Sequence, residues 1–279
     1  LSAGENSMAD MLATQRMEAD NAFGKFVKKH YLDWMGDLEQ GRKSDRPLMS
    51  HEVFKSRVFP LLDQKRKVFL IVIDNFRYDQ WRMLAQEMGD MFDIEENLYT
   101  SILPTATQYA RNAIFSGLMP TQIKQMFPEL WVDESEDEGK NQNEAALIRT
   151  QMERYRRRFT FDYHKINDSQ AADKMMERRG EWANYDLNVV VVNFIDMLSH
   201  ARTESKMVRE LAANERAYRD LTLSWFRHSG IYEMFRELAA ADFHVVLTTD
   251  HGSIRVGKPV KIIGDRNTNT NLRYKLGRN

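Results

Sequence analysis

The stretch Lys67-Val-Phe-Leu-Ile-Val-Ile-Asp74 decides the fold class of this chain. An unbroken apolar run in which most residues are β-branched is typical of a strand that is covered on both faces, as strands of parallel sheets are. Comparable runs recur at 188–195 and 243–249, and helical patterns separate the three. This alternation predicts the α/β class, with a doubly wound, mostly parallel sheet.

Helical spacing of apolar residues dominates much of the remaining chain. It is already present at 8–40, and the Gly, Pro and Ser residues of 41–50 are typical of a linker. We therefore expect a helical segment with its linker at 1–50, followed by an α/β domain at 51–279. Further helices are predicted at 51–62, 79–91, 109–115, 144–157, 170–182, 206–227 and 231–240, with an extended piece at 101–103 and a solvated loop at 133–138.

Composition excludes several classes of protein. Among 279 residues, 40 are Lys or Arg and 41 are Asp or Glu, so the net charge of −1 argues against a globally basic nucleic-acid binder. Cysteine is absent, which rules out disulfides, thiolate zinc sites, iron–sulfur clusters and a cysteine nucleophile. No apolar run approaches the roughly 18 residues of a membrane helix, and the first residues lack a signal-peptide pattern. We expect a cytoplasmic protein without membrane insertion.

Each of the three strongest predicted strands runs into an acidic residue. Asp74 follows the first, Asp196 the second with His200 four residues later, and Asp250 and His251 follow the third. Carboxylates that converge at one sheet edge repel one another unless a cation neutralises them, and Asp with His suits zinc or another divalent ion. The Asp196 and His200 side chains share one face of a helical turn. The alternative is that these residues are ordinary turn or cap residues.

Hydroxyl residues stand at the start of another predicted helix. In the stretch Leu103–Gly117, Thr105 and Thr107 precede the apolar pattern of the helix. Backbone N–H groups at a helix start attract an anion such as phosphate, and a threonine hydroxyl bound to zinc becomes a nucleophile. The alternative is a simple N-cap, a role for which threonine is well suited. Arg111 and Asn112 lie one turn further on, where they either contact phosphoryl oxygens or form a solvent-facing polar pair.

The order of these motifs resembles the alkaline phosphatase superfamily. In that order, Asp74 comes first, then Pro104-Thr-Ala-Thr107, Asp196-Met-Leu-Ser-His200 and Thr249-Asp250-His251-Gly252. The amino-acid sequences of residues 71–81 and 107–117 resemble those of the PglZ subfamily more closely still. More narrowly, the chain resembles PorX-type response regulators of the type IX secretion system, over about 8–279. The resemblance implies a sheet of alkaline phosphatase type and, at 1–50, the helical bundle that follows a receiver domain.

The resemblance also implies a set of metal ligands. The residues are Asp74, Thr107, Asp250 and His251 for one zinc ion, and Asp196, His200 and a later histidine for a second. No histidine follows His251 in this chain. We therefore expect either that the domain is cut short at its C-terminus or that the second site is incomplete.

The function expected from these features is zinc-dependent phosphodiester hydrolysis with Thr107 as the nucleophile. The substrate would be a nucleotide or oligonucleotide phosphodiester, and the domain would be the output of a two-component response regulator for type IX secretion. A sensor kinase would act through an upstream receiver domain, and a homodimer is compatible with the resemblance. One alternative is a non-catalytic zinc-binding module for dimerisation or partner docking, and another is a structural α/β domain without metal.

Overall fold

The computed structural model describes residues 3–133, 141–256, 260–261, 263 and 274–275. The chain divides into two compact units, Leu1–Pro47 and Leu48–Asn279. The first unit contains a single long helix, α1 (Ala3–Glu39), which confirms the helix predicted near the N-terminus. Arg42 then pairs with Asp37 in the last turn of α1, with Nε and Oδ1 3.0 Å apart. None of the described helices is long and apolar enough to span a bilayer.

The second unit is built on a parallel sheet. Its described strands are β1 (Val68–Ile73), β2 (Phe161–Ile166), β3 (Leu187–Val192) and β4 (His244–Thr248), in the spatial order β2-β3-β1-β4. Every neighbouring pair is parallel, with Val68 opposite both Leu187 and His244. All residues of β1 and β3 are buried, as their unbroken apolar runs predict. The predicted α/β class is therefore confirmed.

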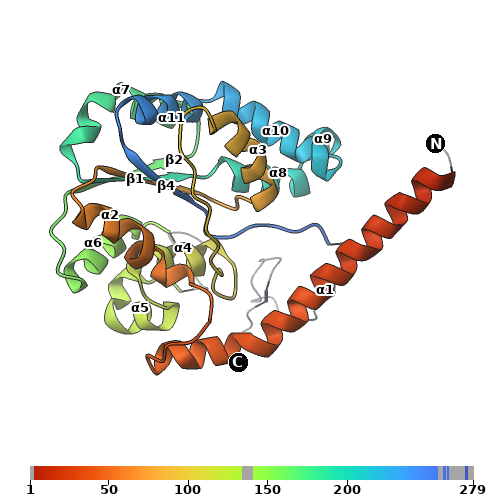
Figure 1. The fold of residues 1–279 in the computed structure, drawn as a ribbon, viewed down its shortest axis with the longest axis horizontal. Coiled ribbons are helices and arrows are strands. Elements are labelled where there is room, and N and C mark those ends of the chain that lie inside the picture. The colour runs from red at the N-terminus through yellow and green to blue at the C-terminus, as the bar shows by residue number, and fades with distance from the viewer. Residues whose placement is uncertain (1–2, 134–140, 257–259, 262, 264–273, 276–279) are drawn as a thin grey trace. The chain divides into compact units, whose positions relative to one another are not determined.

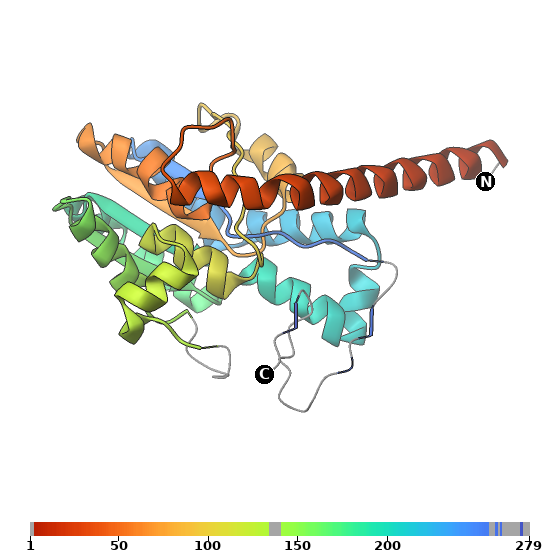
Figure 2. The same ribbon diagram turned by 90° about the horizontal axis from the view of Figure 1, so that it is seen from below.

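Helices cover both faces of the sheet (Figure 1). Because side chains alternate along a strand, Leu70 and Val72 of β1 face one core, and Phe69 and Ile71 face the other. The first core is closed by α2 (Phe59–Asp63), α4 (Thr107–Ser116), α5 (Pro120–Met126) and α6 (Glu144–Arg154). The second is closed by α3 (Tyr78–Met88), α7 (Ser169–Glu177), α10 (Glu215–His228) and α11 (Gly230–Ala240). The helices α4, α5 and α6 lie side by side in both views (Figures 1 and 2), and the fold is doubly wound.

Several predicted elements are divided in the structure. The helix expected at 51–62 consists of η1 (Ser50–Glu52), η2 (Phe54–Val58) and α2, where Pro60 lacks an N–H group for a continuous ladder. The helix expected at 206–227 breaks into α9 (Lys206–Leu211) and α10, because the Asn214 side chain caps α10 by accepting from the Ala217 N–H at 2.9 Å. The helix expected at 170–182 divides into α7 and η4 (Arg179–Asn184).

Other segments differ from the predictions in kind. The structure adds β2, α5 and η3 (Pro128–Leu130), and it contains no strand at 101–103, only an isolated bridge between Met49 and Thr100. The strand expected at 188–195 ends at Val192, and Phe194 begins α8 (Phe194–Glu204). Most of the solvated loop expected at 133–138 lies outside the described residues.

Candidate metal centre

The predicted site residues meet at the carboxyl edge of the sheet. Asp74 directly follows β1, and its N–H donates to the carbonyl of Val192 at 2.9 Å, which extends the ladder between β1 and β3. Asp250 comes two residues after β4. Asp196 lies in the first turn of α8 rather than at the end of a strand, because Phe194 and Ile195 are helical.

Three side chains converge at the start of α4. Thr107 is the first residue of this helix, and its Oγ1 lies 3.3 Å from Asp74 Oδ1 and 3.0 Å from His251 Nε2. The same His251 nitrogen lies 3.3 Å from Asp74 Oδ1. Asp74 and His251 are both buried. A half-buried hydroxyl therefore meets a buried carboxylate and a buried imidazole in one small region.

The loop that carries Asp250 and His251 is held from several sides. The Thr249 hydroxyl accepts from the Phe76 N–H at 3.0 Å, and the Tyr99 hydroxyl donates to the carbonyl of Thr249. Ser101 Oγ donates to the carbonyl of Asp250 at 2.7 Å. These bonds join the end of β4 to the segment after β1 and to the approach of α4, so both site residues project from a fixed backbone.

Asp250 is fully buried and only half satisfied. Its Oδ1 accepts from the backbone N–H groups of Asn75 at 3.3 Å and of His251 at 2.9 Å. Its Oδ2 has no hydrogen-bond donor within the described part of the chain, and the nearest cationic nitrogens, on Arg111 and His251, are 4.0 Å away. A buried carboxylate oxygen without a donor is the kind of atom that a bound cation satisfies.

The two neighbouring carboxylates differ in charge preference. Burial raises the pKa of Asp250 to about 7, and repulsion from Asp74 adds to this effect. Burial also acts on Asp74, but hydrogen bonding to His251 and the positive charge of Arg111 outweigh it, so the pKa of Asp74 falls to about 2. In the absence of a metal ion, one negative charge at this edge is therefore favoured over two.

Asp196 and His200 form an adjacent pair on α8. Asp196 Oδ2 lies 3.4 Å from His200 Nε2, and this contact is the first cause of the raised pKa of His200. The His200 side chain is 67% exposed, and the Asp196 side chain is 22% exposed. Asp74, Asp196 and His251 can each direct one ligand atom into a group that spans no more than 4.8 Å. Carboxylate and imidazole donors without thiolate fit zinc.

Comparison with known families assigns the unit that carries this centre. A family model described as the BREX system PglZ alkaline phosphatase-like domain matches residues 53–279. The chain belongs to the PglZ family. A second model, described as the PorX response regulator linker domain, matches residues 1–35. No curated protein matches the chain. The resemblance inferred from the sequence is thus confirmed at the level of family.

Arg111 and Asn112 occupy different surroundings from those expected. Both are buried in this PglZ domain, so the solvent-facing alternative is wrong. Arg111 Nη1 donates to Asp74 Oδ2 at 2.8 Å, and its Nε donates to Glu144 Oε1 at 2.6 Å. The side-chain Oδ1 of Asn112 accepts from Asn141 Nδ2 at 3.3 Å. Arg111 lies on the interior side of Asp74, and its contact with a phosphoryl group stays a prediction.

Sequence reasoning missed Asn75. This residue adopts a left-handed backbone with φ of 59°, a conformation that asparagine tolerates better than most residues. Its N–H donates to Asp250, and its Nδ2 donates to Asp196 Oδ1 at 3.0 Å. Asn75 therefore links the carboxylates of the two predicted metal sites. The sequence signal that could have identified it is its position: Asn75 follows Asp74, which directly follows the first strand.

Glu144 was missed as well. It is fully buried at the first position of α6, and its only sequence signal is that of an acidic residue in a first helical turn.

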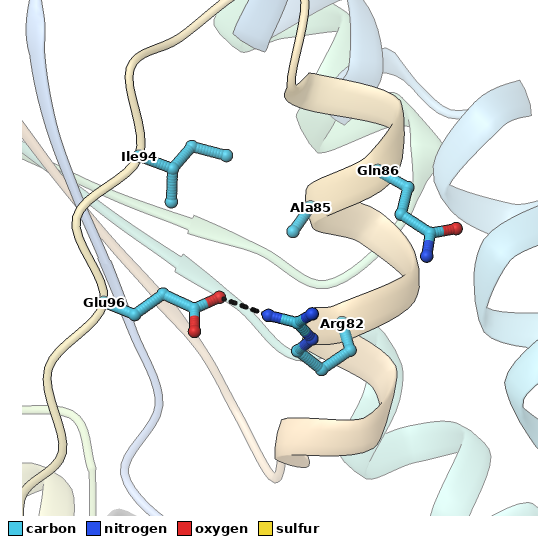
Figure 3. A pocket seen from close by; sticks show the side chains of 5 residues that line it. All are labelled: Arg82, Ala85, Gln86, Ile94 and Glu96. Atoms are coloured by element: carbon cyan, nitrogen blue, oxygen red, sulfur yellow. Dashed lines mark hydrogen bonds and ion pairs between the residues drawn. The ribbon is translucent and has the colours of Figure 1, made fainter.

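A separate pocket is lined by Arg82, Ala85, Gln86, Ile94 and Glu96, where Arg82 pairs with Glu96 at 3.4 Å (Figure 3). None of the predicted site residues lines that pocket.

Proposed function

We propose that this PglZ domain is a zinc-dependent phosphodiesterase with Thr107 as its nucleophile. The observation that carries the proposal is the convergence of Thr107 Oγ1 with Asp74 and His251, beside the buried Oδ2 of Asp250, which no described residue supplies with a hydrogen bond. A hydroxyl held against an aspartate and a histidine, with an unsatisfied carboxylate at hand, suits metal-assisted transfer of a phosphoryl group.

The residues of the centre divide between two ions. The proposed ligands are Asp74, Thr107, Asp250 and His251 for one zinc ion, and Asp196 and His200 for the other. Asp74 and Asp196 are close enough for both sets to lie in one centre. When bound, zinc would lower the pKa of a coordinated hydroxyl and neutralise charge on the phosphoryl group.

The Thr107 side chain performs the covalent chemistry. Its Oγ1 loses its proton to solvent water and bonds to phosphorus while the bond from phosphorus to the leaving alcohol oxygen breaks, and that oxygen takes up a proton from water. Water then cleaves the phosphothreonine, which releases a phosphomonoester and restores the hydroxyl. The buried contacts of Asp74 and His251 orient Oγ1 for attack, and the N-terminus of α4 favours the negative charge of the phosphoryl group.

The proposed biological setting is a cytoplasmic response regulator. The linker match at residues 1–35 supports a regulator in which this domain is the output, and we extend this to type IX secretion under a sensor kinase. We propose a nucleotide or oligonucleotide phosphodiester as the substrate and a homodimer as a form that the regulator adopts.

The nucleophile is tested with a matched pair of variants. In hydrolysis of bis(4-nitrophenyl) phosphate with added zinc, Thr107→Val should lose at least about 100-fold in kcat/KM, since it removes the attacking oxygen. Thr105→Val changes the same side chain two residues earlier and should retain most activity. Turnover by Thr107→Val equal to that of the unchanged protein would refute the assignment.

A second function is favoured by one observation. Along α1, large apolar side chains are exposed, among them Met8, Leu12, Met17 and Phe23. Such a surface supports a partner-docking role, with zinc serving structure rather than hydrolysis. If a Thr107→Val protein restores secretion fully in cells that lack the natural protein, docking is the physiological output. Loss of secretion with normal protein levels would instead assign the output to hydrolysis.

A further inference from the structure

We propose that Glu144 is a positioning residue that sets the metal affinity of the centre by holding Arg111 as a built-in cation against Asp74. This inference rests on the proposed function in one respect, namely that the centre binds zinc. The inference goes beyond the proposed ligands, because Glu144 binds no metal and acts on zinc affinity through the charge of Arg111.

A single buried guanidinium joins two carboxylates. The Arg111 side chain is 3% exposed, and its Nε donates to Glu144 Oε1 at 2.6 Å. Its Nη1 donates to Asp74 Oδ2 at 2.8 Å and to Asn193 Oδ1 at 3.3 Å. The planar fork of arginine makes such contacts directional, so the position of Glu144 determines how the guanidinium meets Asp74.

Glu144 is itself locked in place. It is fully buried, and its Oε2 accepts from the Tyr163 hydroxyl on β2. Lys165 Nζ, two residues along the same strand, lies 3.5 Å from that oxygen. One oxygen of Glu144 therefore faces β2 and the other faces Arg111. This arrangement fixes the carboxylate from both sides.

Arg111 divides the two oxygens of Asp74 between different tasks. Oδ2 is occupied by the guanidinium, while Oδ1 faces Thr107 and His251. Buried carboxylates without a counter-charge are strongly destabilising, so Arg111 allows Asp74 and Asp250 to lie together when no ion is bound. The same charge sits 4.0 Å from Asp250 Oδ2 and repels an incoming divalent cation. Glu144 offsets this repulsion.

The two residues therefore have opposite effects on metal binding. Removing the negative charge of Glu144 leaves the Arg111 charge uncompensated and weakens the binding of zinc. Removing the positive charge of Arg111 strengthens the binding of zinc and destabilises the metal-free protein. If Glu144 and Arg111 served only to pack the core, their substitutions would not change zinc affinity in opposite directions.

The experiment measures zinc affinity by competition with a chromophoric chelator, on the full chain and without turnover. Glu144→Gln should bind zinc about tenfold more weakly than the unchanged protein, and Arg111→Met about tenfold more tightly. Arg111→Met should also have a lower Tm in EDTA, and added zinc should restore it. Tyr163→Phe is the matched control, because it removes a donor to Glu144 without changing the charge, and its affinity should stay within about threefold.

A double variant keeps the test decisive if Arg111→Met does not fold. Arg111→Met with Glu144→Gln removes both charges, so the double variant, prepared with zinc, should bind zinc within about threefold of the unchanged protein. The inference is overturned if Tyr163→Phe and Glu144→Gln weaken zinc binding equally, or if the Glu144 change has no effect on a protein that binds zinc. An unchanged protein that binds no zinc overturns this inference and the proposed function together, whereas loss of the Thr107 assignment alone leaves it standing.

Discussion

At the scale of single residues, the centre depends on side chains that sit in unusual surroundings. Asp250 keeps one oxygen for which the described residues offer no donor, Asn75 adopts a left-handed backbone, and Arg111 is buried between carboxylates. Each of these arrangements is costly by itself and persists only where surrounding contacts impose it. Their concentration at one edge of the sheet is the pattern expected of a functional site.

Asn75 permits a test that separates backbone strain from side-chain bonding. Asn75→Gly tolerates the positive φ but loses the bond to Asp196, whereas Asn75→Ala loses the bond and is strained as well. In urea unfolding, the alanine variant should be about 1 kcal/mol less stable than the glycine variant. Both should hydrolyse bis(4-nitrophenyl) phosphate more slowly than the unchanged protein. An alanine variant as stable as the glycine variant would contradict this reading.

The residues of the centre were only partly predictable. Five of them were predicted from their positions after a predicted strand or at the start of a predicted helix: Asp74, Thr107, Asp196, Asp250 and His251. Burial of Arg111 could not be inferred, since the helical spacing after Thr107 does not reveal which face of α4 meets α6. Glu144 lies 33 residues from Arg111, and no local pattern connects them.

At the scale of secondary structure, an ion network braces the helices beside the centre. Arg77, at the start of α3, binds both oxygens of Asp79 at 2.9 and 2.6 Å and Glu215 of α10 at 2.5 Å. Arg202 of α8 donates to the other Glu215 oxygen at 3.0 Å. The ring of Tyr218 lies beneath both guanidinium groups, with centroid distances of 5.1 and 4.8 Å. The network thus ties α3, α8 and α10 together.

This network predicts a loss of stability in acid. Burial alone would raise the pKa of Glu215, but hydrogen bonds from Arg77 and Arg202 outweigh it and lower that pKa below its ordinary 4.5. A carboxylate with a lowered folded-state pKa stabilises the fold above its unfolded pKa, and this contribution is lost as the pH falls through the folded value.

The measurement compares Glu215→Gln with the unchanged protein by urea unfolding. The variant should be less stable at about pH 7, and the difference should shrink as the pH is lowered through the depressed folded-state pKa of Glu215, where the carboxylate of the unchanged protein takes up its proton. Arg216→Gln is a suitable control, because the Arg216 side chain is 87% exposed and its weak pair with Asp220 spans 3.9 Å. A difference that does not vary with pH would contradict the role given to Glu215.

Helices and strands were predictable where the apolar residues follow a single spacing or form an unbroken run. β1, β3 and β4 were recognised because their apolar runs are continuous, and α1 because its spacing is long and regular. β2 was missed because Phe161-Asp-Tyr-His-Lys-Ile166 mixes charge with apolar residues, as suits a strand at the edge of the described sheet. The break before α10 depends on capping by the Asn214 side chain, which periodicity does not register.

At the scale of the whole molecule, the second unit supplies every residue of the centre. Parallel topology brings Asp74 after β1, Asp196 after β3 and Asp250 after β4 to one edge, although they are spread over most of the chain. This convergence was predictable from the order of strands, because parallel strands end on the same side. The first unit contributes a long helix with exposed apolar side chains.

The central claim is that this edge of the sheet is a two-zinc centre. Crystals grown with zinc and measured on both sides of the zinc absorption edge test it directly. We expect two anomalous peaks about 4 Å apart, one beside Asp74, Thr107, Asp250 and His251, and the other beside Asp196 and His200. The absence of any zinc peak next to Asp74 in such crystals would contradict the account.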